Sequence, residues 1–110
     1  MGWGQLSKVK DHPVMVAFKA GKPKRGGNFN TDGRRVNSYA TMIAFRTSDG
    51  IYHFVLPPEL GGPNWSLSSS AHQRSVRESL KDLKHVAYGD KEYARFQDVL
   101  QLDRQLEAHL

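Results

Sequence analysis

Alternating apolar and polar positions make the first half of the chain rich in predicted strands. In the run PVMVAFKA (13–20), Val14, Val16 and Phe18 alternate with Met15, Ala17 and Lys19 after an opening proline. This pattern is typical of a short strand. Farther along, Asp32-Gly33 and Asp49-Gly50 are turn signals, because glycine readily adopts the positive φ that tight turns require. The segments beside these turns are rich in β-branched and aromatic residues. The strands predicted there are 28–31, 35–47 and 51–56, which form a meander.

A helical spacing replaces this alternation in the last third of the chain. Apolar residues recur there every three or four positions, which predicts a helix. These positions are Val76, Leu80, Leu83 and Ala87. One of the serines at 68–70 is the expected N-cap, because a serine hydroxyl accepts hydrogen bonds from the free amides of the first turn. Gly89 is the expected end of this helix.

A second predicted helix starts with Asp90 as its cap and carries a wide apolar stripe. One side of it shows Tyr93, Phe96 and Leu100, with Asp103 as a possible further member, and the next side shows Val99, Leu102, Leu106 and Leu110. The stripe is wide for a lone surface helix. Either all of it packs on the core, or one flank does so while the other contacts a partner or a second copy of the chain.

The order of these elements indicates the fold class. Strands followed by helices are typical of α+β proteins with an antiparallel sheet. We therefore expect a meander sheet of three to four strands packed against two C-terminal α-helices. The chain has 110 residues and no internal repeat, so we expect a single domain over residues 1–110.

Positive charge is concentrated in the N-terminal third of the chain. The net charge is +5. Residues 1–35 carry eight basic and two acidic residues, whereas 36–70 carries one and two, and 71–110 carries seven of each. Such an asymmetry favours a polyanionic partner. The alternative is that basic loops only keep the protein soluble.

The stretch GKPKRGGNFNTDGRR (21–35) is the main candidate binding site. Lysine and arginine neutralise phosphates and release their counterions. The other possibility is a solvated hairpin loop. A second basic stripe lies on the first predicted helix, but Glu78 and Asp82 interrupt it, so it also fits a salt-bridged surface. The predicted nucleic-acid-binding residues are Lys22, Lys24, Arg25, Arg34, Arg35, Arg74 and Arg77.

No sequence pattern typical of catalysis, metal binding or cofactor binding is present. The absence of cysteine removes disulfides, cysteine-ligated zinc and thiol catalysis. The histidines lack metal-site spacing, and GKPKRGG lacks the G-K-[ST] of a phosphate-binding P-loop. The serines before His72 are explained more simply as helix caps than as nucleophiles. We expect no enzymatic activity, no metal and no cofactor.

Membrane insertion and secretion are not expected either. No run approaches the ~18 apolar residues of a membrane-spanning helix. The opening MGWGQLSKVKD lacks the apolar core of a signal peptide. We therefore expect a soluble cytoplasmic protein.

Two segments resemble a family of small proteins from bacteriophages, archaeal viruses and plasmids. NTDGRRVNSYATMIAF is similar to the family's T-D-G turn and S-Y-x-T-x-I-A strand. WSLSSSAHQRSVRESL is similar to its S-x-T-T-S-x-H-Q segment, which opens a helix. The matching residues are Thr31, Asp32, Gly33, Ser38, Tyr39, Thr41, Ile43, Ala44, Ser66, Ser68, Ser69, Ser70, His72 and Gln73. The resemblance covers residues 28–83 and implies a mobile element of a bacterial or archaeal host; no established activity comes with it.

The family motif also suggests a structural role for its polar residues. We expect Thr31 and Asp32 to fix the turn, and the serine-rich cap with His72 to hydrogen-bond to the neighbouring strand. For the whole protein we expect a non-enzymatic phage-type accessory protein that binds DNA or RNA through the basic loop and hairpin. The alternative is a protein-binding inhibitor, of the anti-defence kind, that docks on a host or rival nucleoprotein complex. Only the first should bind naked nucleic acid at near-physiological salt.

Overall fold

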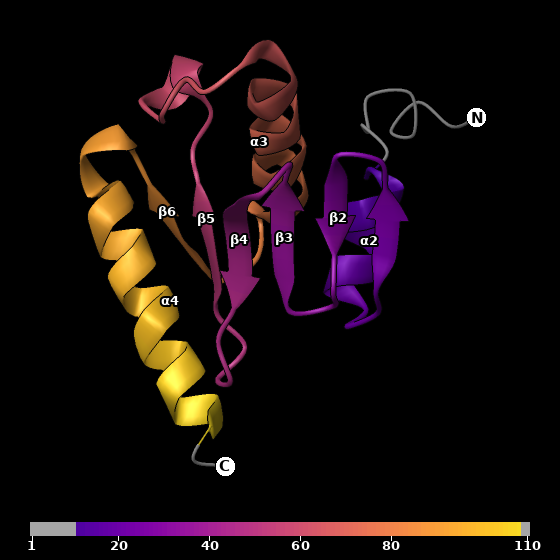
Figure 1. Ribbon diagram of the computed structural model, residues 1–110, viewed down its shortest axis with the longest axis vertical. Coiled ribbons are helices and arrows are strands. Elements are labelled where there is room, and N and C mark those ends of the chain that lie inside the picture. Colours follow the sequence, from indigo (N-terminus) through magenta and orange to yellow (C-terminus); the bar gives the residue numbers. More distant parts are fainter. Residues whose placement is uncertain (1–10, 109–110) are drawn as a thin grey trace.

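A six-stranded sheet with helices on both faces organises the chain in the computed structural model, which describes residues 11–108 (Figure 1). The helices are α2 (Pro13–Lys19), α3 (Leu67–Leu80) and α4 (Tyr93–Ala108), with short 3₁₀ turns η1 (Pro58–Leu60) and η2 (Asp90–Glu92). The strands are β1 (Lys24–Gly26), β2 (Phe29–Thr31), β3 (Arg35–Ser38), β4 (Thr41–Arg46), β5 (Tyr52–Val55) and β6 (His85–Tyr88). The predicted α+β class is therefore correct, with more strands than expected.

The strands lie in the order in which they occur along the chain. From β1 to β5 each strand pairs antiparallel with the next, as a meander. The last strand, β6, pairs parallel with β5, in the register Tyr52↔His85 to Val55↔Tyr88. A parallel pair needs a crossover connection, and α3 lies in that connection.

Two apolar clusters hold helices to opposite faces of the sheet. The larger joins α2 and α3 to one face through residues such as Phe18, Phe54 and Leu80. The smaller joins α4 to the other face, with Phe96 packed against strand residues that include Val55. Phe54 and Val55 are neighbours in β5 but belong to different clusters, because successive residues of a strand point to opposite faces of the sheet. In Figure 1, α4 lies along the β6 end of the sheet and α2 lies at the β1–β2 end.

The prediction of a strand at 13–20 was wrong, because this segment forms α2. Pro13 occupies the first turn, where a missing amide costs nothing, and the His12 side chain accepts a hydrogen bond from the Val14 amide. Val14, Met15 and Phe18 are fully buried, and Val16 is 55% exposed. The buried positions thus follow helical spacing rather than alternation.

The predicted strand 35–47 is also corrected, since it is two strands joined by a tight turn. Ser38 pairs with Thr41, so that only Tyr39 and Ala40 form the turn. Tyr39 adopts a φ of 56°, which is uncommon for a residue other than glycine. Its amide donates to the Asn28 carbonyl at 2.6 Å. Because neither turn residue is glycine, asparagine or aspartate, the pattern gave no signal for this turn.

The first predicted helix begins earlier than expected and ends well before its predicted end. Its N-cap is Ser66, whose hydroxyl accepts from the Ser69 amide at 3.0 Å, rather than a serine at 68–70. It ends at Leu80, and the residues predicted to continue it toward Gly89 form β6 instead. Pairing with β5 therefore overrides the helical spacing in this segment.

The final helix is preceded by a 3₁₀ turn rather than capped directly by Asp90. Glu92 reaches back to accept a hydrogen bond from the Gly89 amide at 3.0 Å. Leu110 of the predicted stripe and the segment 1–10, where no signal peptide is predicted, lie outside the described residues. No helix within 11–108 is long and apolar enough to cross a membrane.

Candidate nucleic-acid interface

The 31–35 turn orders the end of the basic stretch. The Asp32 carboxylate accepts hydrogen bonds from the amides of Arg34 and Arg35, both at 2.8 Å. The Thr31 hydroxyl donates to the Arg35 carbonyl and accepts from the Gly33 amide. Partial burial opposes ionisation of Asp32, but these amide bonds and the Arg35 charge outweigh it and lower its pKa. The expected role of Thr31 and Asp32 in fixing the turn is thus confirmed.

Gly33 lets this turn pack closely against the chain that leaves α2. Its φ is 100°, and a Cβ atom there would lie 2.7 Å from the Gly21 carbonyl oxygen. The Arg46 side chain joins the same two segments, because it donates to the carbonyls of Gly33 and Phe18, both at 3.3 Å. The basic stretch is therefore an ordered hairpin and turn held on the sheet.

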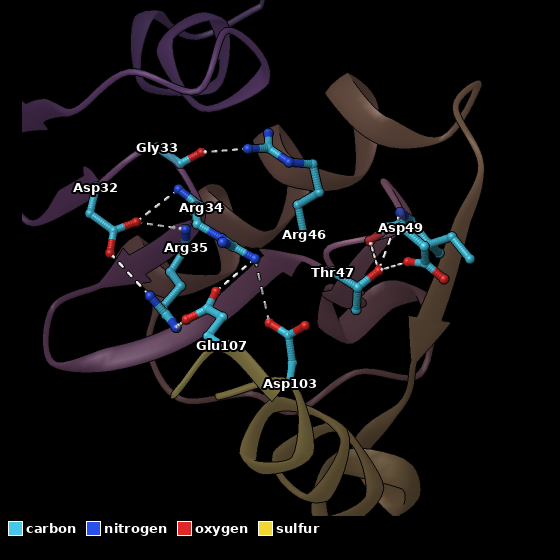
Figure 2. Close-up of polar contacts among 10 residues, drawn as sticks. Asp32, Gly33, Arg34, Arg35, Arg46, Thr47, Asp49, Asp103 and Glu107 are labelled. Carbon is cyan, nitrogen blue, oxygen red and sulfur yellow. Dashed lines mark hydrogen bonds and ion pairs between the residues drawn. The ribbon is translucent and has the colours of Figure 1, made fainter. Parts of the chain in front are cut away.

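Two of the predicted binding residues, Arg34 and Arg35, form ion pairs with α4 (Figure 2). The Glu107 carboxylate lies between them, with Oε1 2.6 Å from Arg34 Nη2 and Oε2 2.9 Å from Arg35 Nη2. Arg34 Nη2 also lies 3.9 Å from Asp103 Oδ2, and Arg35 Nη1 lies 3.5 Å from Asp32 Oδ2. We call Arg34 and Arg35 the arginine clamp.

The residues predicted on α3 do not join the rest of the predicted site. Arg74 pairs with Glu59 at 2.5 Å and Arg77 with Glu78 at 3.1 Å. The hydrogen bond from Arg74 lowers the pKa of Glu59. Because α3 covers the face of the sheet opposite to α4, Arg74 and Arg77 lie on a different surface from the arginine clamp.

The α4 side of β1–β3 forms an open face with a polar row across the strands. In the strand register Arg25 lies opposite Asn30, Asn30 opposite Asn37, and Asn37 opposite Met42. The buried apolar partners of α4 all belong to β4, β5 and β6, and Met42 packs beside them, so the apolar packing of α4 does not extend to Arg25, Asn30 and Asn37. A cavity of about 300 Å³ lies over the row. It is lined by Arg25, Asn30, Thr31, Asp32, Arg35, Asn37, Met42 and Arg104.

Sequence reasoning missed Arg104, which α4 brings to the open face. No local pattern marks it, because its position depends on how α4 docks on the sheet. Arg104 and the predicted residues Lys22, Lys24 and Arg25 are exposed, and none has an acidic ion-pair partner within 11–108. Lys24 and Arg25 lie on β1, at the edge of the sheet.

A serine–histidine contact is present, but its geometry is structural. The Ser38 hydroxyl lies 2.7 Å from His72 Nδ1 and donates to the Ser69 hydroxyl at 3.0 Å. Ser38 is fully buried, so a substrate cannot reach its oxygen. These contacts confirm the expectation that the serine-rich cap and His72 tie the helix to the strand. Within the part of the chain that the structure describes, no three His, Asp or Glu residues form a metal site.

Comparison of the chain with family models, with curated proteins and with solved structures gives no match. The resemblance to a phage and plasmid family therefore stays a prediction that rests on the two sequence segments alone.

Proposed function

We propose that the protein is a small non-enzymatic accessory protein that binds nucleic acid through the open face and the β1 edge. One observation carries the proposal. Arg25 and Arg104 line the cavity of the open face, Lys24 lies next to Arg25 on the edge strand β1, and Lys22 lies just before that strand; all four are exposed and have no acidic ion-pair partner in residues 11–108. The sequence resemblance adds a mobile-element setting, in the cytoplasm of a bacterial or archaeal host.

The chemistry of the open face supports contact with phosphates rather than stacking of bases. Proteins that bind single strands on a sheet commonly place aromatic rings there. The residues that line the cavity include arginines, asparagines and Met42 but no aromatic ring. Binding of this kind is mainly electrostatic, tolerant of sequence and steeply salt-dependent.

Fluorescence anisotropy with labelled duplex DNA, single-stranded DNA and RNA across a salt series tests the proposal. We expect Arg25→Ala with Arg104→Ala to weaken binding to every sequence that the protein binds. Each lost phosphate contact should lower the log–log salt slope by about one.

The control removes the same charge from the other end of α4. Lys91 in η2 and Arg95 in the first turn of α4 are exposed there, so Lys91→Ala with Arg95→Ala should leave most of the affinity and the salt slope. Equal losses in the two double variants would mean that net charge, and not the open face, causes binding. No binding by the unmodified protein at low salt would overturn the proposal.

A protein-binding inhibitor is the second candidate, and the exposed flank of α4 favours it. Leu102 and Leu106 are 60% and 61% exposed. With Val99 they line a groove of about 220 Å³ beside the β4–β5 turn. Contiguous exposed apolar side chains often mark protein contacts. The partner would be an acidic or nucleic-acid-binding protein, or a second copy of the chain in a homodimer.

Oligomeric state and nucleic-acid affinity together separate the two candidates. Light scattering after size exclusion would detect a homodimer, and Leu102→Ser with Leu106→Ser should then return it to monomers. If the unmodified protein binds no nucleic acid but captures a nucleoprotein complex through these leucines, the inhibitor is correct.

A further inference from the structure

The Glu107 carboxylate fills a site between two arginines that has the charge and shape to hold an oxyanion. Each of its oxygens approaches one guanidinium, at 2.6 Å for Arg34 and 2.9 Å for Arg35 (Figure 2). The charged N–H groups of arginine bind the oxygens of carboxylates and of phosphates alike. The arginine clamp is thus a formed anion site whose present occupant belongs to the chain itself.

Glu107 satisfies this site incompletely. Arg34 Nε and Arg35 Nε are buried without a hydrogen-bond partner, and Glu107 Oε1 also lacks a hydrogen bond of good geometry despite its short ion pair. Unpartnered buried donors are rare in folded proteins. A phosphodiester group has two ester oxygens in addition to its two charged oxygens, so it offers further acceptors to the donors that Glu107 leaves free.

The part of α4 that carries Glu107 is held to the sheet by charge rather than by apolar packing. The apolar residues of α4 that pack in the core lie between Tyr93 and Leu100. Beyond them only Asp103 is buried, and Leu102 and Leu106 are largely exposed.

We infer that a phosphodiester of the bound nucleic acid replaces the Glu107 carboxylate in the arginine clamp. This inference rests on the proposed function and names how its site takes the ligand. Arg25 and Arg104 line the same cavity as Arg35 of the clamp, so a nucleic-acid backbone that enters the clamp continues over further cations. The last turns of α4 leave the sheet when the exchange takes place.

Anisotropy with a labelled single-stranded oligonucleotide and the variant Glu107→Gln tests the exchange. Glutamine keeps the shape of the side chain and removes the competing charge. The apparent affinity is proportional to the fraction of molecules whose clamp is free of Glu107, and the variant raises that fraction. We therefore expect it to bind about fivefold more tightly or better.

Glu78→Gln is the matched control. Glu78 also pairs with two cations, Arg77 and Lys81, each at 3.1 Å, but on α3. Because screened charges act weakly at a distance, this control should change affinity by less than about twofold. Equal gains in the two variants would overturn the exchange.

Hydrogen–deuterium exchange of the peptide 101–108 gives a second readout. A helix end without tertiary contacts frays in water. We expect the amide hydrogens of this peptide to be replaced by deuterium faster when the oligonucleotide is added. Equal deuterium uptake with and without it would contradict the inference. If the unmodified protein and both variants bind nothing at low salt, the proposed function fails. If they bind equally well, only the displacement of Glu107 by the phosphodiester is contradicted.

Discussion

Ser38, Ser69 and His72 form a polar cluster between β3 and α3 that we expect to stabilise the fold. His72 stacks on Phe29, with ring centroids 4.5 Å apart and ring planes within 4° of parallel. Its Nδ1 meets Ser38, which is fully buried. Ser38 therefore depends on His72 and Ser69 for its hydrogen bonds. The contact lies between strand and helix, so its loss should weaken their packing rather than any reaction.

We expect His72→Ala to lower the free energy of unfolding by about 1–3 kcal/mol, because a buried hydroxyl loses a partner. His72→Phe keeps the ring on Phe29 and removes only the hydrogen bond, so its loss should be smaller. Urea denaturation of the two variants measures both effects. An unchanged stability of His72→Ala would contradict the structural role.

Elements show which parts of α4 hold it to the sheet. Phe96 is fully buried and contacts Phe45, Tyr88 and Tyr93, whereas Leu102 projects from the exposed flank. Apolar packing of the helix is therefore concentrated in its first half.

We expect Phe96→Ala to destabilise the protein by about 3–5 kcal/mol, the usual cost of such a cavity. Leu102→Ala should cost well under 1 kcal/mol if the chain is monomeric, since exposed substitutions seldom matter. Thermal and urea unfolding would check both values. A large, concentration-dependent loss for Leu102→Ala would instead indicate a homodimer through α4.

The elements also show how far the sequence alone could predict the fold. The turns at Asp32-Gly33 and Asp49-Gly50 were correct, because glycine marks them in any context. The apolar residues of segment 13–20 fit both the two-residue repeat of a strand and the 3.6-residue repeat of a helix. Burial of the neighbours Val14 and Met15 together with Phe18 shows the helix. β6 could not be predicted, because its partner β5 lies far away along the chain.

The candidate site was predictable only in part, for the same reason. Its free cations Lys22, Lys24 and Arg25 are neighbours in the sequence and stand out as a basic run. Arg104 and Glu107 come from α4, and their relation to that run exists only after docking. Local charge could therefore suggest a polyanion, but it could not show which arginines are already paired.

At the scale of the whole molecule, stability should depend on the protonation of two histidines. Burial lowers the pKa of His53, outweighing the nearby charges of Asp49 and Asp103. Burial also lowers the pKa of His72, and His12 adds to this. Below their usual pKa of about 6.5 the unfolded chain binds protons that the folded protein does not yet bind.

We therefore expect full stability from these histidines above about pH 6.5, and a decline as pH falls below it toward their lower folded pKa values. Urea denaturation between about pH 7.5 and 5.5 stays above the range in which the carboxylates titrate. His53→Asn with His72→Asn should flatten the dependence. A slope that persists in this double variant would assign it to other groups.

The parallel strand β6 has a consequence for the order of folding. The pairs from β1 to β5 join neighbouring segments and close short loops, whereas β5 meets β6 only after the connection that contains α3 is complete. Contacts between distant segments form late, because closing a long loop costs entropy. Until then β5 is the edge of the sheet, with Phe54 and Val55 on an unpaired backbone that invites association with other chains. A nascent chain that stops before His85 should therefore aggregate, and pairing of β6 with β5 is the step that removes this exposed edge.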